Sequence, residues 1–472
     1  MPDAPANGPL GRLRLTDGLV LGFVGVLSAA LHGVAIAAGL RFSSKDFSAR
    51  QLSQIWQLLP TRLLRHDLVS SLAHLHSQPP LFNLVTGVLL ELPRATQPLA
   101  ADLGLAACAV AVAVCTAGIL LEFEVKRSVV LFVVLLFVVA DPAQYLYAGF
   151  YFYALPTAAL ATAAGWAATR WVRTERVVPG VAFGALAAML VLTNSSYQVY
   201  TVAIASVPVL WVLRRRWRQA IAVLAVPAAV VASWYAIDVI QFHSATTSSW
   251  LGMNLARSTL SLDSSADINA LIRQGVLSPT ARIGPFYDLG AYGALGVHAR
   301  TGQPALDQRE KAGAPNFNNI AYLGISRRYL ADDLKWIEHR PGHYLKNTTI
   351  GLRLWMLPAE QFYATVNLGA YHLGGYTTVY DAIAMLQPTA DPTAVNDVVF
   401  AHRGPSLSNL SYTTIAESIL ALFVLPIVAV RRWRRRRDRA LAAGALWIWA
   451  MCASVFVSTT LLEAAENNRF RF

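Results

Sequence analysis

Charged side chains are scarce in this 472-residue chain. Asp, Glu, Lys and Arg make up 14% of it, while hydrophobic residues make up 55%. An average soluble domain carries about 25% charged residues, so this composition excludes an ordinary soluble protein and predicts a polytopic membrane protein. Acids are the scarcer sign, with 27 against 39 Lys and Arg, and the net charge is +12. The basic residues stand in short runs between apolar segments, as the positive-inside rule expects, which argues against nucleic-acid binding.

Cysteine is nearly absent as well. Cys108, Cys115 and Cys452 stand in apolar segments and lack the spacing of a metal site. We interpret them as small apolar packing residues, and we expect no disulfide framework. No cofactor is expected either, although the sequence leaves a need for a divalent metal open.

Long apolar segments are what the chain has instead of charge. A span needs about 20 mainly apolar residues. Nine segments come near this length: 18–40, 101–121, 129–147, 150–168, 179–196, 198–213, 219–238, 413–430 and 441–461. The first is too long for the 7–15-residue core of a signal peptide and predicts an uncleaved first span. The stretch 81–92 is too short to cross and predicts an interfacial helix.

Arginine runs predict the topology. They follow the fourth, sixth and eighth apolar segments, and two arginines precede the first. If all of these groups are cytoplasmic, an even number of crossings separates them, and residues 41–100 and 239–412 lie outside. The predicted organisation is a disordered cytoplasmic N-terminus (1–17), a membrane core (18–240), an extracytoplasmic mixed domain (241–412) and C-terminal spans with an outer tail (413–472). In the outer domain a helix is expected at Asn318–Glu338, and loops or short strands at Gly369–Tyr380.

Two motifs carry a resemblance to a known family. After the first span comes an outer loop with Asp46 and then His76-Ser77-Gln78-Pro79-Pro80-Leu81-Phe82-Asn83, and the chain closes with ENNRFRF. This layout resembles the GT-C superfamily of polyprenyl-phosphate-sugar-dependent glycosyltransferases, which includes protein O-mannosyltransferases and lipid A aminoarabinose transferases. Its members typically have an acidic outer loop and a His-Pro-Pro-Leu-like segment. Here a serine and a glutamine separate the histidine from the prolines. The resemblance covers roughly 18–240 and 413–472.

The resemblance implies that a sugar moves from a polyprenyl-phosphate donor to an extracytoplasmic glycan, lipid or protein, with inversion. The acceptor hydroxyl then needs a base, for which Asp46 is the leading candidate and the N-cap of a following helix is its structural alternative. Asp67 is a second candidate unless it forms a salt bridge with Arg62 or Arg65. Asp141 is a third, or a turn residue before Pro142.

The departing phosphate needs fixed positive charge. Arg469, Arg471 and Arg257 are the candidates, because an arginine fork fits phosphate oxygens; at a span end an arginine is also a common interfacial anchor. His76 is placed with the catalytic candidates. Gln78, Asn83 and Glu466 are candidate substrate-binding residues, while His76 and Gln78 are equally ordinary loop residues.

Other features leave alternatives open. The Tyr/Phe-rich stretch 145–153 suits either sugar stacking or an interfacial aromatic belt. His32 stands alone in the first span and fits a packing role better than a functional one. We expect a hexosyl- or pentosyltransferase of a bacterial plasma membrane, in contact with membrane lipids and acting in cell-envelope glycan assembly. The alternatives are a lipid-carrier transporter or flippase, and a non-catalytic scaffold subunit of an envelope-building complex.

Overall fold

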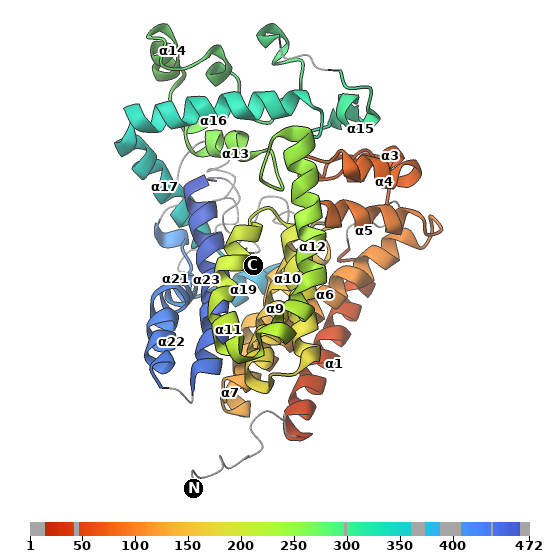
Figure 1. Ribbon diagram of the computed structural model, residues 1–472, viewed down its shortest axis with the longest axis vertical. Coiled ribbons are helices and arrows are strands. Elements are labelled where there is room, and N and C mark those ends of the chain that lie inside the picture. The colour runs from red at the N-terminus through yellow and green to blue at the C-terminus, as the bar shows by residue number, and fades with distance from the viewer. Residues whose placement is uncertain are drawn as a thin grey trace.

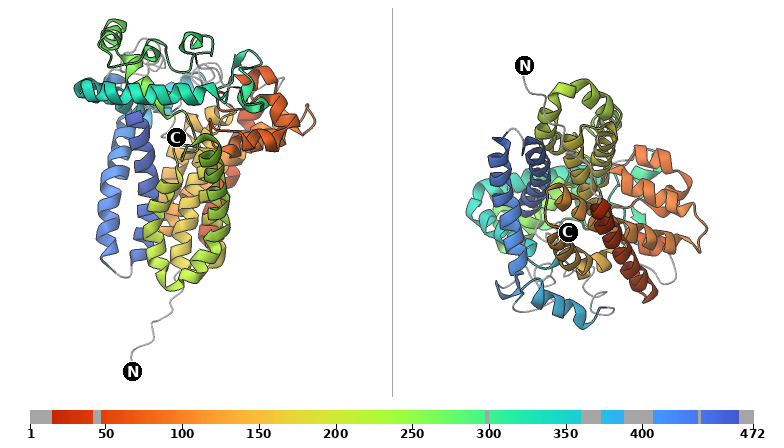
Figure 2. Two further views of the ribbon diagram at one scale, coloured as in Figure 1. Left: turned by 45° about the horizontal axis from the view of Figure 1, so that its top comes forward. Right: turned by 90° about the horizontal axis from the view of Figure 1, so that it is seen from below.

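The computed structural model describes residues 15–41, 47–296, 300–359, 373–387, 407–435 and 438–462, and helices dominate them. Long helices stand side by side in a bundle, and α16 crosses one end of it (Figure 1). Figure 2 shows α14 beyond α16, and the short helices α3 to α5 at the same end of the bundle; α13 lies on the bundle side of α16 (Figure 1). Among the residues described, polypeptide outside the bundle therefore covers one of its ends and not the other.

The bundle consists of α1 (Leu15–Ala37), α6 (Gln97–Glu122), α7 (Arg127–Val134), η1 (Leu135–Val139), α8 (Pro142–Ala148), α9 (Ala154–Thr174), α10 (Val177–Thr193), α11 (Val199–Val212), η2 (Leu213–Arg216), α12 (Trp217–Phe242), α21 (Tyr412–Ile419), η8 (Leu420–Val424), α22 (Leu425–Trp433) and α23 (Arg439–Leu462). In the part of the chain that the structure describes, five helical stretches are long and apolar enough to cross a membrane: Leu15–Ala37, Gln97–Glu122, Val199–Phe242, Tyr412–Trp433 and Arg439–Leu462. The pair Arg127–Val139 and Pro142–Ala148, bent by 48°, makes a sixth if it counts as one span.

The expectation of nine spans is therefore wrong for the described residues. The segments 198–213 and 219–238 form one helical stretch with a 3₁₀ turn inside it, and 129–147 forms the bent pair. The segment 179–196 forms α10, which has only 17 residues, and α9 is not among the helices that meet the criteria of length and hydropathy. At 1.5 Å per residue, α10 extends about 26 Å, short of a hydrocarbon layer of about 30 Å.

Tyrosine hydroxyls donate hydrogen bonds to the backbone carbonyls at the break in the bent span. A bend of 48° after the π-helical turn η1 takes carbonyl groups out of the helical hydrogen-bond pattern. Tyr145 donates to the Val139 carbonyl (2.6 Å) and Tyr380 to the Leu136 carbonyl (2.9 Å), while Tyr376 donates to Ala140. A bilayer offers no water to such carbonyls, so these hydroxyls make the break tolerable at membrane depth.

The first outer loop forms α2 (Ala49–Ser53), α3 (Thr61–His66), α4 (Leu68–Ala73) and α5 (Pro80–Leu90). Pro80 occupies the first turn of α5, where a proline costs no helical hydrogen bond. With 11 residues α5 is too short to span, as expected for 81–92. Phe82 of α5 packs with Phe47 and Leu155 in one apolar core, which joins the loop to the bundle.

The region 241–412 is not a mixed domain in its described parts. Its elements are α13 (Leu251–Ser258), η3 (Leu260–Leu262), α14 (Ser265–Arg273), η4 (Pro279–Arg282), η5 (Gly293–Leu295), α15 (Pro304–Asp307), β1 (Glu310–Lys311), β2 (Ala314–Pro315), α16 (Ala321–His339), α17 (Pro341–Trp355), α19 (Gly375–Ile383) and η7 (Leu407–Asn409). The only strands described are the two-residue antiparallel pair, with Lys311 opposite Ala314. The helix expected at Asn318–Glu338 is present as α16. Where loops or short strands were expected near Tyr380, the chain forms α19, because its tyrosines at i and i+4 pack on the bent span.

The arginine runs gather at one end of the bundle. Arg170 and Arg173 bind Glu122 at the end of α6 (2.6 and 3.2 Å), and Arg216 binds Glu175 (2.6 Å). The run after α22 joins them, because Trp433 packs on the core that contains Trp171 and Leu213. In Figure 1 this end is the lower one, opposite α16.

Candidate functional site

His76 connects the first outer loop (residues 41–100) to residues 249 and 318, at the end of the bundle that α16 covers, through hydrogen bonds. It is 3% exposed. Its Nε2–H donates to the Asn318 carbonyl (3.0 Å), and its Nδ1 accepts from the Ser249 hydroxyl (2.7 Å). The Asn318 side-chain oxygen also accepts from the His76 amide (2.9 Å). Burial lowers the pKa of His76 to about 4, so the ring is neutral and both of its nitrogens are occupied by protein. This geometry gives His76 a positioning role between the two segments.

Asn83 has a similar structural role inside the loop. Its Oδ1 accepts from the Leu59 amide (2.8 Å) and its Nδ2 donates to the Gln57 carbonyl (2.9 Å), with no exposed surface. Gln78, also predicted to bind substrate, is 5% exposed. In this structure the motif His76–Asn83 is thus part of the packing between the loop and its neighbours.

Lys311, which the sequence analysis did not select, makes a second hydrogen-bonded connection between the first outer loop and the segment that contains β1 and β2. Its side chain is 2% exposed, and its Nζ donates to the carbonyls of Ile55 (2.7 Å), Leu58 (2.6 Å) and, at 3.4 Å, Trp56. Burial lowers the pKa of Lys311 to about 7. The hairpin of β1 and β2 therefore supplies a hydrogen-bond donor to carbonyls that follow α2, of which Ile55 also accepts from the Leu58 amide.

The two other acidic candidates, Asp67 and Asp141, have different surroundings in the structure. Asp67 lies half-buried between α3 and α4, and no ion pair to Arg62 or Arg65 occurs within the described ranges. Asp141 caps α8, since its Oδ1 accepts from the Ala143 amide (2.8 Å). This cap agrees with the turn-residue interpretation, and Asp141 stays a candidate base. Arg257 stands half-buried in the last turn of α13.

The remaining candidates, Asp46, Glu466, Arg469 and Arg471, lie outside the described residues. Asp46 is joined by a peptide bond to Phe47, which is described and buried. The Phe47 ring lies 4.9 Å from the ring of Tyr151, measured between centroids. The aromatic stretch 145–153 thus contacts the residue next to the leading catalytic candidate.

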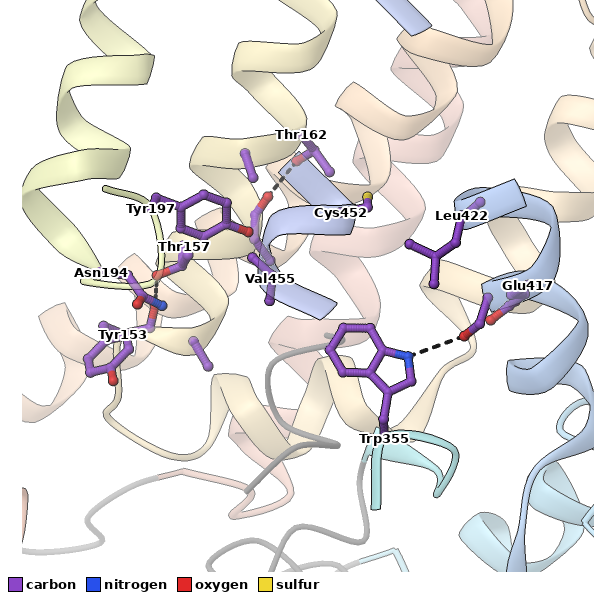
Figure 3. A pocket seen from close by; sticks show the side chains of 15 residues that line it. Tyr153, Thr157, Thr162, Asn194, Tyr197, Trp355, Glu417, Leu422, Cys452 and Val455 are labelled. Atoms are coloured by element: carbon purple, nitrogen blue, oxygen red, sulfur yellow. Dashed lines mark hydrogen bonds between the residues drawn. The ribbon is translucent and has the colours of Figure 1, made fainter. Parts of the chain in front are cut away.

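A cavity of about 270 Å³ opens within the bundle (Figure 3). It lies between α9, the 194–197 loop, the end of α17, α21 with η8, and α23. Its lining consists of Tyr153, Ala154, Thr157, Ala158, Ala161, Thr162, Asn194, Tyr197, Trp355, Glu417, Ser418, Ala421, Leu422, Cys452 and Val455. Most of these side chains are apolar or small, and Glu417 is the one carboxylate among them. Such a wall, apolar with a few polar groups, is typical of a small-molecule site.

Several polar groups in the wall are already hydrogen-bonded. Thr157 donates to the Tyr153 carbonyl (2.7 Å), Thr162 to Ala158 (2.8 Å), and the Trp355 indole to the Ser418 hydroxyl (3.2 Å). The hydroxyl protons of both threonines are therefore used within α9.

Tyr153 connects the cavity to the aromatic stretch. Its ring lies 5.8 Å from that of Phe82, which lies 5.3 Å from Tyr151, the neighbour of Phe47. Contiguous aromatic contacts therefore lead from the cavity wall to the residue beside Asp46. Sequence reasoning noted the aromatic stretch, but no sequence signal joins α9, α17, α21 and α23 around one space. Within the described ranges, no group of three His, Cys, Asp or Glu residues is arranged to hold a metal ion.

Helix length and hydropathy define this chain as a multi-pass helical membrane protein. No family model matches it, and neither a curated protein nor a solved structure does. What the protein does must therefore be argued from its own residues and geometry.

Proposed function

We propose that this protein is a membrane glycosyltransferase of GT-C type, which moves a sugar from a polyprenyl-phosphate carrier to an extracytoplasmic acceptor. One observation carries the proposal: an apolar cavity inside a membrane bundle is linked by the rings of Tyr153, Phe82 and Tyr151 to Phe47, beside the outer-loop acid Asp46. A donor of this kind joins a long apolar chain to a charged head group. It therefore needs an apolar space inside the bundle that ends near polar chemistry.

In the proposed reaction the acceptor oxygen bonds to the anomeric carbon while the bond from that carbon to the phosphate oxygen breaks. The acceptor proton passes to Asp46, and the polyprenyl phosphate leaves with the bonding electron pair. Arg469 stabilises the departing phosphate, with Arg471 and Arg257 as further candidates. The attack comes from the side opposite the phosphate, so the configuration at the anomeric carbon inverts.

The proposed topology puts the arginine-rich end of the bundle and the N-terminus in the cytoplasm of a bacterial cell. The first loop and residues 241–412 then lie outside, where α16 and its neighbours cover the bundle and select the acceptor. The clustering of Arg170, Arg173 and Arg216 at one end supports this orientation. A chain of this kind acts in cell-envelope glycan assembly.

The test is a transfer assay in nanodiscs, with radiolabelled polyprenyl-phosphate sugars and a membrane-glycan extract. We expect transfer in the wild type, its loss in Asp46→Asn, and its strong reduction in Arg469→Ala. Ala161→Trp, which fills the cavity, is expected to lower transfer at least tenfold. Ala232→Trp, on an exposed face of α12, is the matched control and should retain transfer. Equal transfer by Ala161→Trp and Ala232→Trp would separate the cavity from the reaction.

A second candidate function, a lipid-carrier transporter, is favoured by Asp238. This α12 side chain is 2% exposed and has no ion pair among the described residues, and Trp234 is its neighbouring hydrogen-bond donor. A buried acid in a membrane helix is typical of ion-coupled transport. Vectorial movement of a lipid carrier that persists in Asp46→Asn but is lost in Asp238→Asn would favour the transporter. If neither transfer nor transport occurs and a partner stably co-purifies with the protein, the scaffold alternative is favoured.

A further inference from the structure

The turn between α11 and α12 marks where the apolar surface of the bundle stops. Along α11 the exposed side chains include Ile204 and Val207, and along α12 they include Ile221 and Val226. Trp211 and Trp217, 54% and 56% exposed, stand on either side of the turn. Exposed tryptophans at the edge of an apolar helix surface are typical of the level of lipid head groups. The sequence from Trp211 to Arg218 therefore lies at a membrane boundary.

This segment, which we name the Arg–Trp turn (residues 211–218), holds its arginines against its tryptophans. The guanidinium of Arg214 lies 5.0 Å from the centre of the Trp211 ring, and that of Arg218 lies 5.4 Å from the Trp217 ring. Arg214 also donates to the Trp211 carbonyl (2.9 Å). These contacts orient both guanidinium groups, so less side-chain freedom remains to be lost when they bind an anion.

Most of the positive charge of the turn is uncompensated. Arg216 pairs with Glu175, but Arg214, Arg215 and Arg218 are exposed and have no acidic partner in the part of the chain that the structure describes. By contrast, Arg170 and Arg173 are used internally, because both bind Glu122. The anion-attracting groups at this end therefore include oriented guanidinium groups directly beside lipid-facing apolar surface.

We propose that the Arg–Trp turn is a binding site for anionic phospholipids, in which the guanidinium groups of Arg214 and Arg218 bind head-group phosphate while Trp211 and Trp217 lie among the head groups. The continuity of the turn with the apolar surfaces of α11 and α12 selects a bilayer lipid as the occupant. The site lies apart from the cavity and does not depend on the proposed glycosyl transfer.

The test compares phosphatidylglycerol with phosphatidylcholine of the same acyl chains, each added to the full-length protein in detergent, with bound lipid counted by native mass spectrometry. Each basic residue near an anionic leaflet strengthens binding about fivefold, so the double variant R214Q/R218Q should bind phosphatidylglycerol about 25-fold more weakly. R214K/R218K keeps the charge but loses the planar guanidinium fork, so its affinity for phosphatidylglycerol should lie between those of the wild type and R214Q/R218Q. R431Q/R432Q removes two exposed arginines of α22 for which no ring contact is described, and should have a smaller effect.

Three results would overturn the proposal. The first is equal binding of phosphatidylglycerol and phosphatidylcholine by the wild type. The second is an equal loss in R431Q/R432Q and R214Q/R218Q, which would reduce the site to net charge. The third is displacement of phosphatidylglycerol by inorganic phosphate at equal concentration, which would show a free-phosphate site. The substituted side chains are exposed, so each variant is expected to remain folded. Its elution volume in size-exclusion chromatography checks this.

Discussion

Replacing Lys311 by methionine should weaken the contact between the first outer loop and the segment that contains β1 and β2. Methionine nearly matches the lysine side chain in length but donates no hydrogen bond. The Leu58 carbonyl, which accepts from Nζ at 2.6 Å, would then be left buried without this donor, while the Ile55 carbonyl (2.7 Å from Nζ) would keep only the Leu58 amide (3.0 Å). The Trp56 carbonyl at 3.4 Å would lose a weaker contact.

The magnitude follows from these three bonds. A buried acceptor that loses its partner costs about 1–3 kcal/mol, which applies to Leu58, and the lost second bond of Ile55 adds about 1 kcal/mol, so the bonds suggest a loss of about 2–4 kcal/mol. The methionine no longer buries an amine, which returns part of this cost. We therefore expect a net loss of about 1–3 kcal/mol, measured as a lower midpoint of thermal unfolding in detergent. Because Lys311 contacts residues 55–58, limited proteolysis should also cut the first loop faster in K311M.

The matched control is K335M, which removes an exposed lysine of α16. We expect its unfolding midpoint and cleavage rate to equal those of the wild type. If K311M and K335M were equally stable, or if K311M were more stable than the wild type, the argument that Lys311 fastens the two segments would be wrong.

Three further predictions use the same unfolding assay. Burial raises the pKa of Asp333 to about 8, against about 4 in an unfolded chain, so the protein loses stability as the pH rises from 4 to 8. Asp333→Asn should therefore stabilise it by on the order of 4 kcal/mol at pH 8 and by almost nothing at pH 4; a gain that did not depend on pH would contradict this. The low pKa of His76 means that stability falls as the pH drops from about 6.5 to about 4, and His76→Phe should abolish this fall while lowering stability at pH 7 by about 2–4 kcal/mol. Tyr380→Phe leaves the Leu136 carbonyl without its donor and should cost about 1–3 kcal/mol, whereas Tyr412→Phe, at an exposed position, should cost almost nothing.

Local patterns predicted individual elements well. The proline pair before 81–92 and the shortness of that apolar stretch predict α5, because proline suits a first helical turn and 11 residues cannot cross a bilayer. Apolar residues at helical spacing predict α16, and the residues Arg340-Pro341 end it. Counting spans failed, because hydropathy does not report a bend. The stretch 129–147 is mainly apolar, yet it breaks next to Asp141 and Pro142, where Tyr376 and Tyr380, distant in sequence, supply hydroxyl donors.

The candidate site was predictable only in part. Asp141 and Asn83 were chosen for their chemistry, but their contacts in the structure are an N-cap and a loop-to-helix bridge. A motif cannot distinguish these roles, because both require the same hydrogen-bonding groups. The cavity wall combines α9 with Trp355, Glu417 and Cys452, whose separation in the chain hides their proximity.

Composition and periodicity determined that this chain is a helical membrane protein. A surface with little charge and long apolar runs is stable in a lipid bilayer, where helices satisfy their own backbone hydrogen bonds. They also indicated that its arginines group at one end. Tertiary structure alone decided where the spans break, which polar groups are occupied by the fold, and where a cavity opens. These features depend on contacts such as Lys311 with residue 55 and Tyr380 with residue 136, and contacts between segments so distant in sequence arise only when the helices pack.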